Sequence, residues 1–414
     1  MTDLISIGSR SKAAQRQLSK LGGALRTQAL RTVAEDIDKN RDAITQANNR
    51  DIENGRANGL NEGLIDRLTL TKARVDSIVD SILQIASSPD PVGKTVWGET
   101  RPNGLKISKV TVPLGVIAVI YESRPNVTAD AAALCLKAGN SVILKGGKEA
   151  KNSNKAIADI MRSALENSGI PADCIILIED SDRETTKALM TLNEYVDVLI
   201  PRGGAGLIKA VVENSTVPVI ETGVGNCHVY IDREADMEKA VKILVNAKTS
   251  RVSVCNACES LLVHKDIAEF ALIAAGDALK EKNVEIRGDE AVCAVLPYAV
   301  PATQDDWGRE YLDYIISAKV VNDIDEAIEH INTYGTGHSE CIVTENYSDA
   351  VRFTDEVDAA AVYVNASTRF TDGGEFGFGA EIGISTQKLH ARGPLGLANL
   401  VTDKYIIGGD GQIR

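Results

Sequence analysis

Two cysteines in the stretch 253–258 (Ser-Val-Cys-Asn-Ala-Cys) carry side chains that could do covalent chemistry. A cysteine thiolate can attack an acyl carbon, and a backbone N–H at the same turn can stabilise the oxyanion that forms. The spacing of Cys255 and Cys258 also fits a redox pair or half a zinc site, but no second pair or histidine cluster stands at ligand spacing, so no metal is expected. A single cysteine is most often a small core residue. From the residues alone, a catalytic role and a core-packing role are therefore about equally well supported.

Three further patterns follow predicted buried strands. Glu221 precedes glycines that let the backbone pass close to a ligand, so it is either a general base or a solvated loop carboxylate. Lys145 and Lys148 flank two glycines, at a position that suits phosphate or ribose, although a solvated lysine pair is nearly as good an interpretation. The turn 202–206 (Arg-Gly-Gly-Ala-Gly) is a weak dinucleotide signal, because it lacks the full G-x-G-x-x-G spacing.

The elements that must hold these residues alternate between strands and helices. The first block has predicted strands at 116–121, 141–144, 174–177, 196–200 and 217–220, and predicted helices at 129–138 and 154–167 and from 183 and 207. The second block has predicted strands at 229–231, 261–263, 318–321, 341–343 and 361–364, and predicted helices at 236–245, 267–279 and 324–331. This alternation is typical of βαβ crossovers and predicts an α/β fold with a doubly wound parallel sheet.

The two ends of the chain do not show this alternation of strands and helices. The first ninety or so residues predict helices, with one apolar stripe formed by Leu18, Leu21, Leu25, Ala29, Val33 and Ile37 and another helical pattern at 72–85. Glycines crowd residues 373–408, which predicts loops and an extended tail.

Composition excludes several classes of function. The 414 residues carry 45 Lys and Arg against 58 Asp and Glu, and a net charge of −13 argues against generic nucleic-acid binding. The longest nearly apolar run, 110–121, is too short for a membrane span. Seven scattered cysteines and an N-terminus without an apolar signal region lead us to expect reduced thiols and a cytoplasmic protein.

Several longer blocks make the motifs more specific. The segment 113–116, Lys145, the turn 221–223 and Cys255 occur in the order found in the aldehyde dehydrogenase superfamily. The blocks 121–128 (YESRPNVT), 335–340 (GTGHSE), 362–370 (VYVNASTRF) and 385–394 (STQKLHARGP) resemble the γ-glutamyl phosphate reductase family within it. The resemblance covers essentially the whole chain.

This resemblance implies an activity and an organisation. The activity is the NADPH-dependent reduction of L-glutamyl 5-phosphate to L-glutamate 5-semialdehyde with release of phosphate, the second step of proline biosynthesis from glutamate. The implied domains are an NADP(H)-binding domain (1–96 and 112–228), a catalytic domain (229–395) and a β-hairpin plus C-terminal oligomerisation arm (97–111 and 396–414). A homo-oligomer is expected, and glutamate 5-kinase is a candidate partner.

The resemblance also assigns roles to single residues. Cys255 is the nucleophile, which needs an electropositive or helix-terminal environment to ionise. Its backbone N–H and the side-chain amide of Asn126 are the candidate oxyanion donors. Glu221 matches the glutamate that activates water in hydrolytic members, but a reductase must not hydrolyse its thioester, so positioning of substrate or nicotinamide is the expected role. Arg124, Arg369 and Arg392 are candidates for substrate binding because a guanidinium binds carboxylate and phosphate well.

The implied cofactor site uses a second set of residues, which are Lys145, Lys148, Gly203, Gly204, Gly223 and Glu310. Lys145 corresponds to the lysine that contacts the adenosine ribose. Lys148 stands where NAD-preferring members often carry an acid, and a lysine there attracts a 2′-phosphate, which favours NADPH over NADH.

Three alternatives remain at this level. A hydrolytic NAD(P)-dependent semialdehyde dehydrogenase is permitted by Glu221, although the blocks around Arg124, Arg369 and His390 weigh against it. A catalytically silent member of the superfamily is disfavoured by the presence of Cys255. A redox sensor could use a disulfide between Cys255 and Cys258, but packing is the plainer role for Cys258.

Overall fold

The computed structural model describes residues 2–414, which form two compact units. The first unit contains the chain up to Thr222 together with Gly377–Gly383 and Pro394–Arg414, and the second contains Gly223–Phe376 and Ile384–Gly393. The division therefore falls after residue 222 and not after residue 228 as expected. The reason is that Cys227–Ile231 is already a strand of the second unit's sheet.

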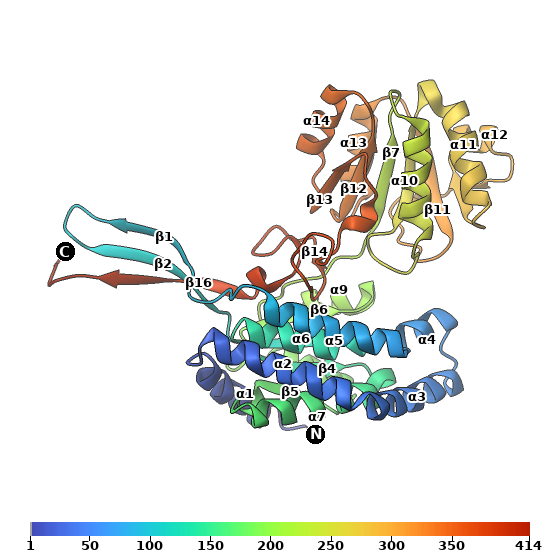
Figure 1. The fold of residues 1–414 in the computed structure, drawn as a ribbon. Helices are drawn as coiled ribbons and strands as arrows, with labels where there is room; N and C mark the ends of the chain where they lie inside the picture. The colour runs from blue at the N-terminus through green and yellow to red at the C-terminus, as the bar shows by residue number, and fades with distance from the viewer. Residues whose placement is uncertain (1) are drawn as a thin grey trace. The chain divides into compact units, whose positions relative to one another are not determined.

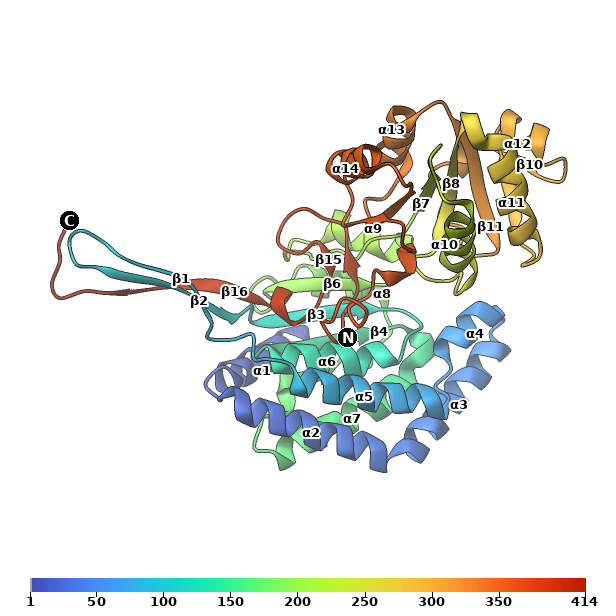
Figure 2. The same ribbon diagram turned by 45° about the horizontal axis from the view of Figure 1, so that its top comes forward.

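The first unit is built on a four-stranded parallel sheet (Figure 1). Its strands, in the spatial order β5-β4-β3-β6, are β5 (Ile175–Leu177), β4 (Ser141–Gly146), β3 (Val116–Tyr121) and β6 (Val198–Arg202). Its helices are α1 (Leu4–Leu18), α2 (Gly23–Lys39), α3 (Arg41–Ala57), α4 (Glu62–Leu68), α5 (Lys72–Ser87), α6 (Asn126–Lys137), α7 (Lys151–Asn167), α8 (Arg183–Met190) and α9 (Ala205–Asn214). Helices α6 and α7 pack on this sheet, and α2 and α5 pack on them in turn (Figure 2). The predicted doubly wound parallel sheet is confirmed.

The predicted N-terminal stripe is wrong in one respect, because it crosses a break between two helices. Helix α1 ends at Leu18 and α2 begins at Gly23, and Gly22 before it has the extended backbone of a cap (ψ 154°). Leu25 is consequently 37% exposed, whereas Leu18 and Val33 are fully buried. The glycine pair at 22–23 is the signal for the break, since glycine is unfavourable inside a helix.

Two other sequence predictions can be compared directly with this unit. Gly139 follows α6 with a left-handed backbone (φ 76°), as expected for the residue that ends a helix. The predicted strand at 217–220 does not form, and a single bridge joins Val219 to Leu199. The run continues the alternation of strands and helices, but Pro218 inside it has no N–H to donate to a ladder with β6.

A separate antiparallel sheet belongs to the same unit. Its order is β1-β2-β16, with β1 (Thr95–Thr100), β2 (Lys106–Pro113) and the C-terminal β16 (Val401–Gly408). The register pairs Val401 with Pro113 and Gly408 with Lys106, so the two segments run side by side although they are far apart in sequence. Figures 1 and 2 both show this sheet extending away from the helices of its unit.

The second unit is built on a seven-stranded parallel sheet. Its order is β10 (Val300–Pro301), β9 (Glu285–Gly288), β11 (Ile315–Val321), β8 (Cys258–His264), β7 (Cys227–Ile231), β12 (Ser339–Val343) and β13 (Ala361–Val364). Its helices are α10 (Met237–Thr249), α11 (Ala268–Lys280), α12 (Glu290–Val295), α13 (Ile324–Tyr334) and α14 (Tyr347–Glu356). Residues from α10 to α12 pack in one apolar cluster and residues from α13 and α14 in another.

The sequence analysis missed the strand β9 and the helices α12 and α14, which are short or polar. The remaining strands are β14 (Ile384–Ser385) and β15 (Gly393–Pro394). The 3₁₀ segments are η1 (Lys148–Ala150), η2 (Ala172–Cys174), η3 (Lys265–Ile267), η4 (Gln304–Asp306), η5 (Thr368–Phe370) and η6 (Leu397–Asn399). Within residues 2–414, no helix combines the length and the apolar character that a membrane span requires.

Candidate active site

The turn between α10 and β8 carries Cys255, whose side chain is half-buried. A hydrogen bond of 3.1 Å from the Ala257 N–H to the Val254 carbonyl closes this turn. Cys258 is instead the first residue of β8, is fully buried, and donates from Sγ to the Ser260 carbonyl at 3.3 Å. Burial raises the pKa of the Cys258 thiol well above its usual range. Of the two cysteines, Cys255 is therefore the partly exposed one.

The segment that leads into β7 runs directly against this turn. A Cβ atom on Gly225 would lie 1.4 Å from the Cys255 carbonyl oxygen, so a side chain cannot be accommodated there. The Sγ of Cys227 donates to the same oxygen at 3.2 Å. Glu310 accepts the Gly225 N–H at 2.8 Å, and Gly223 donates its N–H to the Ile384 carbonyl at 2.7 Å. Glu310 and Gly223, both expected at the cofactor, thus hold the loop that supports the cysteine turn.

A guanidinium without a carboxylate partner lies at this turn. Arg369 donates from Nε to the Ser250 hydroxyl at 2.9 Å and from Nη1 to the Asn256 side-chain oxygen. In the part of the chain that the structure describes, it forms no ion pair. Burial lowers the pKa of Arg369 from its usual value, Arg251 lowers it further, and the negative charge of an ionised Cys255 acts in the opposite direction. The guanidinium of Arg369 therefore places a positive charge close enough to interact with Cys255.

Arg392, another predicted substrate residue of this unit, is in a different situation. Its guanidinium lies 2.8 Å from the Asp358 carboxylate, and the ammonium of Lys388 lies 2.5 Å from the same group. The two cations hold the pKa of Asp358 below its usual range. Because its guanidinium is already paired with a carboxylate, Arg392 is less suited than Arg369 to bind an arriving anion.

The first unit contains three of the predicted catalytic and substrate residues, which are Arg124, Asn126 and Glu221. Arg124 belongs to the loop between β3 and α6, and Asn126 is the first residue of α6. The Asn126 amide donates to Asp130 at 3.0 Å, so one of its two hydrogens is engaged. Burial raises the pKa of Asp130, although the Asn126 hydrogen bond opposes this shift. Glu221 is half-buried and is the next-to-last residue of the unit's first segment.

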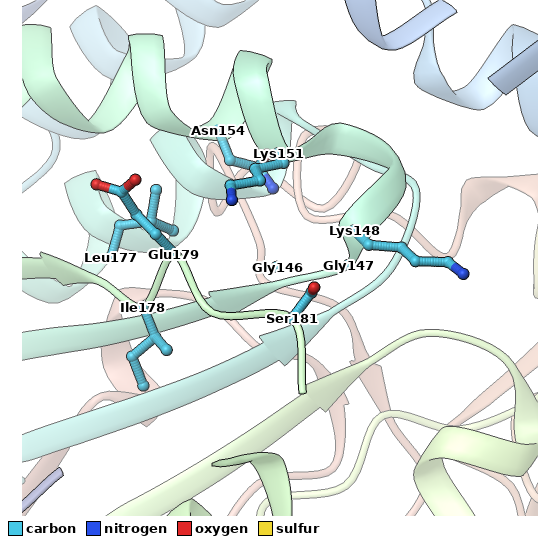
Figure 3. A pocket seen from close by; sticks show the side chains of 9 residues that line it. All are labelled: Gly146, Gly147, Lys148, Lys151, Asn154, Leu177, Ile178, Glu179 and Ser181. Atoms are coloured by element: carbon cyan, nitrogen blue, oxygen red, sulfur yellow. The ribbon is translucent and has the colours of Figure 1, made fainter. Parts of the chain in front are cut away.

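The carboxyl end of β4 carries the predicted phosphate-binding and ribose-binding lysines. Lys145 is 4% exposed, and burial lowers its pKa although Asp180 and Glu149 act against this shift. A pocket opens beyond the strand between Gly147, the start of α7 and the loop after β5 (Figure 3). Lys148 and Lys151 line it together with Ser181, and the Lys148 side chain extends away from Lys151.

The second glycine turn, Gly203–Gly204, precedes α9 in the same sheet. The Gly204 N–H donates to the Glu122 carboxylate at 3.0 Å, and Gly204 caps the helix without a side chain of its own. The sequence analysis missed Glu122. The available signal was its place directly after β3, since β6 is the parallel neighbour of β3 and ends at Arg202.

Comparison with known proteins decides the family. The sequence pattern of the aldehyde dehydrogenase family matches residues 2–295 and 299–382. A γ-glutamyl phosphate reductase of Lachnospira eligens is 59% identical over 414 residues, which is 100% of both chains. The chain belongs to the γ-glutamyl phosphate reductase family. A further γ-glutamyl phosphate reductase, from Carboxydothermus hydrogenoformans, is 56% identical over the full length of both chains.

Solved structures agree with membership of the γ-glutamyl phosphate reductase family. The crystal structure of a γ-glutamyl phosphate reductase from Thermotoga maritima matches with a TM-score of 0.96 at 49% identity, covering 100% of each chain. An acetylating aldehyde dehydrogenase from Geobacillus thermoglucosidasius, at 20% identity and a TM-score of 0.71, shares the fold. The predicted aldehyde dehydrogenase-like fold is thus confirmed. The chain is an oxidoreductase of proline biosynthesis, and its family implies a nicotinamide cofactor.

The residues at the edge of the first unit's sheet fit a dinucleotide of this kind. Lys145, near the end of β4, and Lys148, after it, are cationic side chains, and the backbone N–H of Gly204 binds an anionic group, the Glu122 carboxylate. Donors of this type, at the carboxyl ends of parallel strands, are those that phosphates and ribose require. The second unit contains Cys255 and its neighbour Asn256, a residue that the sequence analysis missed.

Proposed function

We propose that the chain reduces L-glutamyl 5-phosphate to L-glutamate 5-semialdehyde with NADPH, through a thioester on Cys255. The observation that carries this proposal is the partly exposed Cys255 turn with the unneutralised guanidinium of Arg369 beside it. A nearby cation favours the thiolate, which is the attacking form of cysteine. The name of the full-length relatives at 59% and 56% identity supports the choice of substrate.

The proposed reaction passes through a covalent thioester on Cys255. The Cys255 thiolate attacks the acyl carbon, a C–S bond forms, and the C–O bond to the phosphate breaks with phosphate leaving as an anion. When bound, the nicotinamide cofactor supplies the hydride that reduces the acyl group. Hydride addition leaves a thiohemiacetal oxyanion, whose negative charge passes to sulfur as the C=O bond re-forms and the C–S bond breaks, so the free aldehyde leaves with Cys255 again a thiolate. Phosphate is a good leaving group, so the chain needs little general-acid help for the first step.

Other groups support these steps in the proposal. The Cys255 backbone N–H and the side-chain amide of Asn126 are candidate oxyanion donors. Arg369 attracts the phosphoryl group, while Arg124 and Arg392 remain predictions for the substrate's carboxylate. Glu221 positions substrate or nicotinamide and does not act as a base, because hydrolysis of the thioester would waste the acyl phosphate.

The reverse reaction tests this function. Oxidation of glutamate 5-semialdehyde with NADP⁺ should require orthophosphate and yield an acyl phosphate, which hydroxylamine converts to a hydroxamate. The physical reason is that phosphate, attracted by Arg369, attacks the thioester in place of water. NADP⁺ reduction that proceeds without phosphate and yields free glutamate would contradict the proposal and favour the alternative, a hydrolytic semialdehyde dehydrogenase.

The cofactor preference rests on Lys148. We expect the unaltered chain to prefer NADPH and Lys148→Glu to shift the preference toward NADH, because a carboxylate repels the 2′-phosphate and a lysine attracts it. The loss of a charge-assisted contact costs about 1.5–3 kcal/mol, which is tenfold or more in relative specificity. The measurement is kcat/KM with both cofactors. Lys187→Glu, an equal charge change on the exposed face of α8, should leave the ratio unaltered. If the ratio of kcat/KM for the two cofactors is unchanged in Lys148→Glu, other residues recognise the 2′-phosphate.

The antiparallel sheet β1-β2-β16 supports the expectation of a homo-oligomer. Tyr405, Ile406 and Ile407 on β16 are 59%, 52% and 61% exposed, and Trp97 on β1 is 44% exposed. Neighbouring apolar side chains on the edge strands of a sheet favour contact with another chain. An association with glutamate 5-kinase stays a prediction.

The oligomer can be tested on β16. Replacing both Tyr405 and Ile407 with lysine should weaken assembly at least tenfold, because charges would have to be desolvated in the interface. Thr402→Lys, on the same strand but without loss of an apolar side chain, should have a smaller effect. Sedimentation equilibrium measures the mass in each case. A single species of 44.2 kDa for the unaltered chain would rule out the oligomer.

A further inference from the structure

The short segment that contains η5 is fastened to the nucleophile turn by one residue, Asn256. Its side chain is 6% exposed. The Nδ2 atom donates to the Arg369 carbonyl at 3.2 Å and to the Thr371 carbonyl at 3.0 Å. The Oδ1 atom accepts from Nη1 of Arg369, and the Asn256 backbone carbonyl accepts from the Thr368 hydroxyl at 2.7 Å. Asn256 is also the residue directly after Cys255, so these bonds connect the nucleophile's own turn to Arg369.

The pattern of donors and acceptors requires an amide at this position. Asparagine offers two N–H donors and a carbonyl acceptor on one planar group, and all three are used here. Aspartate keeps the shape and an acceptor for Arg369 but loses both donors and adds a negative charge. Alanine loses every side-chain bond.

Thr371, whose carbonyl accepts from Asn256, is itself held in place. The Thr371 hydroxyl shares hydrogen bonds with Ser339 (2.6 Å) and Tyr363 (2.7 Å) on the neighbouring strands β12 and β13. Ser339 in turn contacts the Nδ1 atom of His338 at 2.8 Å. Thr371 is therefore held by the sheet. Because Asn256 bonds both the Thr371 carbonyl and the Arg369 guanidinium, it fixes the guanidinium relative to the sheet.

The charge of Arg369 is left available by this arrangement. Both of its side-chain partners, Ser250 and Asn256, are neutral acceptors. The other charged or titratable groups that act on it are Arg251, Cys255, Asp372 and Cys227. Cys227 is buried in β7 and its pKa is raised well above the usual range, so it is a neutral thiol. A guanidinium with neutral partners can serve an anion that arrives later.

We propose that Asn256 is a positioning residue: it holds the guanidinium of Arg369 at the Cys255 turn, so that one charge serves both the cysteine thiolate and a phosphoryl dianion. The second part rests on the proposed function, because it assumes that the acyl phosphate reacts at Cys255. The first part does not depend on the substrate.

The test follows the reactivity of Cys255 in the full chain without substrate. The rate of alkylation by iodoacetamide is measured against pH, with mass spectrometry of the Cys255 peptide to separate it from the other six cysteines. Removing a nearby opposite charge raises the midpoint of ionisation by about one unit or more. We therefore expect an upward shift of this size in Asn256→Ala and in Arg369→Gln, and no further shift when both are combined. Asn256→Asp should also raise the midpoint, because its carboxylate neutralises Arg369.

A matched control separates positioning from general stability. Asn48 in α3 is 1% exposed and makes three similar bonds, to the Leu68 carbonyl (2.8 Å), the Ser153 hydroxyl (3.1 Å) and the Leu70 N–H (2.7 Å). Asn48→Ala should lower the melting temperature as Asn256→Ala does, but leave the alkylation midpoint in place. If the Asn256 variants alter only the melting temperature, the positioning role is wrong.

Inorganic phosphate tests the second part. It should slow alkylation of Cys255 in the unaltered chain and lose this effect in Arg369→Gln and Asn256→Ala. Phosphate that gives no protection in the unaltered chain would overturn the phosphoryl part of the proposal. A failure of the proposed reductase function would appear instead as absent phosphate dependence of semialdehyde oxidation, with the alkylation midpoints still shifted.

Discussion

Replacing Cys255 with alanine is expected to abolish turnover while the fold survives. The proposed reaction passes through a covalent bond to this sulfur, and removal of a catalytic nucleophile lowers kcat by roughly 10⁴-fold or more. The side chain is half-buried in a turn, so its loss creates little cavity in the core. Steady-state rates with glutamyl phosphate and NADPH give the loss of activity, and circular dichroism reports on the fold.

Cys258 provides the matched control. It stands three residues away in the same segment, but it is fully buried at the start of β8 and burial keeps its thiol protonated. Cys258→Ala should therefore retain substantial activity, with a modest loss of stability from the small cavity. Equal loss of activity in the two variants, with normal circular dichroism in both, would show that Cys255 is not the nucleophile.

The sequence was most informative where local pattern and tertiary structure agree. The run 116–121 is a central strand with every residue buried, and Gly139 ends the helix that follows. Cys255 lies in a turn between a helix and a strand, as its polar neighbours predict. These features depend on a few adjacent residues, so the sequence contains nearly all the information that they require.

The parts that failed depend on contacts between distant residues. Asn256 and Arg369 are more than one hundred positions apart, and nothing in either local pattern shows that the amide binds the guanidinium. Glu122 meets Gly204 because β3 and β6 are neighbours in the sheet, which alternation alone does not order. The run 217–220 has the composition of a strand, but whether it extends the sheet depends on a partner that local propensity does not specify.

A buried ion pair in the second unit carries another large expected effect. Lys248 on α10 and Glu259 on β8 lie 2.5 Å apart, and both side chains are fully buried. The other carboxylate oxygen of Glu259 accepts the Leu312 N–H at 3.0 Å. Burial raises the pKa of Glu259 to about 7, although the charge and hydrogen bond of Lys248 oppose this shift. In this buried environment, the charged form of the Glu259 carboxylate is stabilised by the positive charge of Lys248.

At pH 8, Lys248→Met should destabilise the protein by about 3–5 kcal/mol, since removing the lysine leaves the buried carboxylate of Glu259 without a compensating charge. Because the pKa of Glu259 is raised in the folded state, the fold favours the protonated form, and this contribution to stability is lost as pH rises through about 7. The penalty in Lys248→Met should accordingly be larger at pH 8 than at pH 5, where folded Glu259 is already neutral. Urea unfolding of the variant and the unaltered chain at both pH values measures this difference in the free energy of unfolding. Lys239→Met, which removes an exposed ion pair from the same helix, should have a much smaller effect. If Lys248→Met does not lower the free energy of unfolding, or lowers it more at pH 5 than at pH 8, then Lys248 does not stabilise the charged form of Glu259.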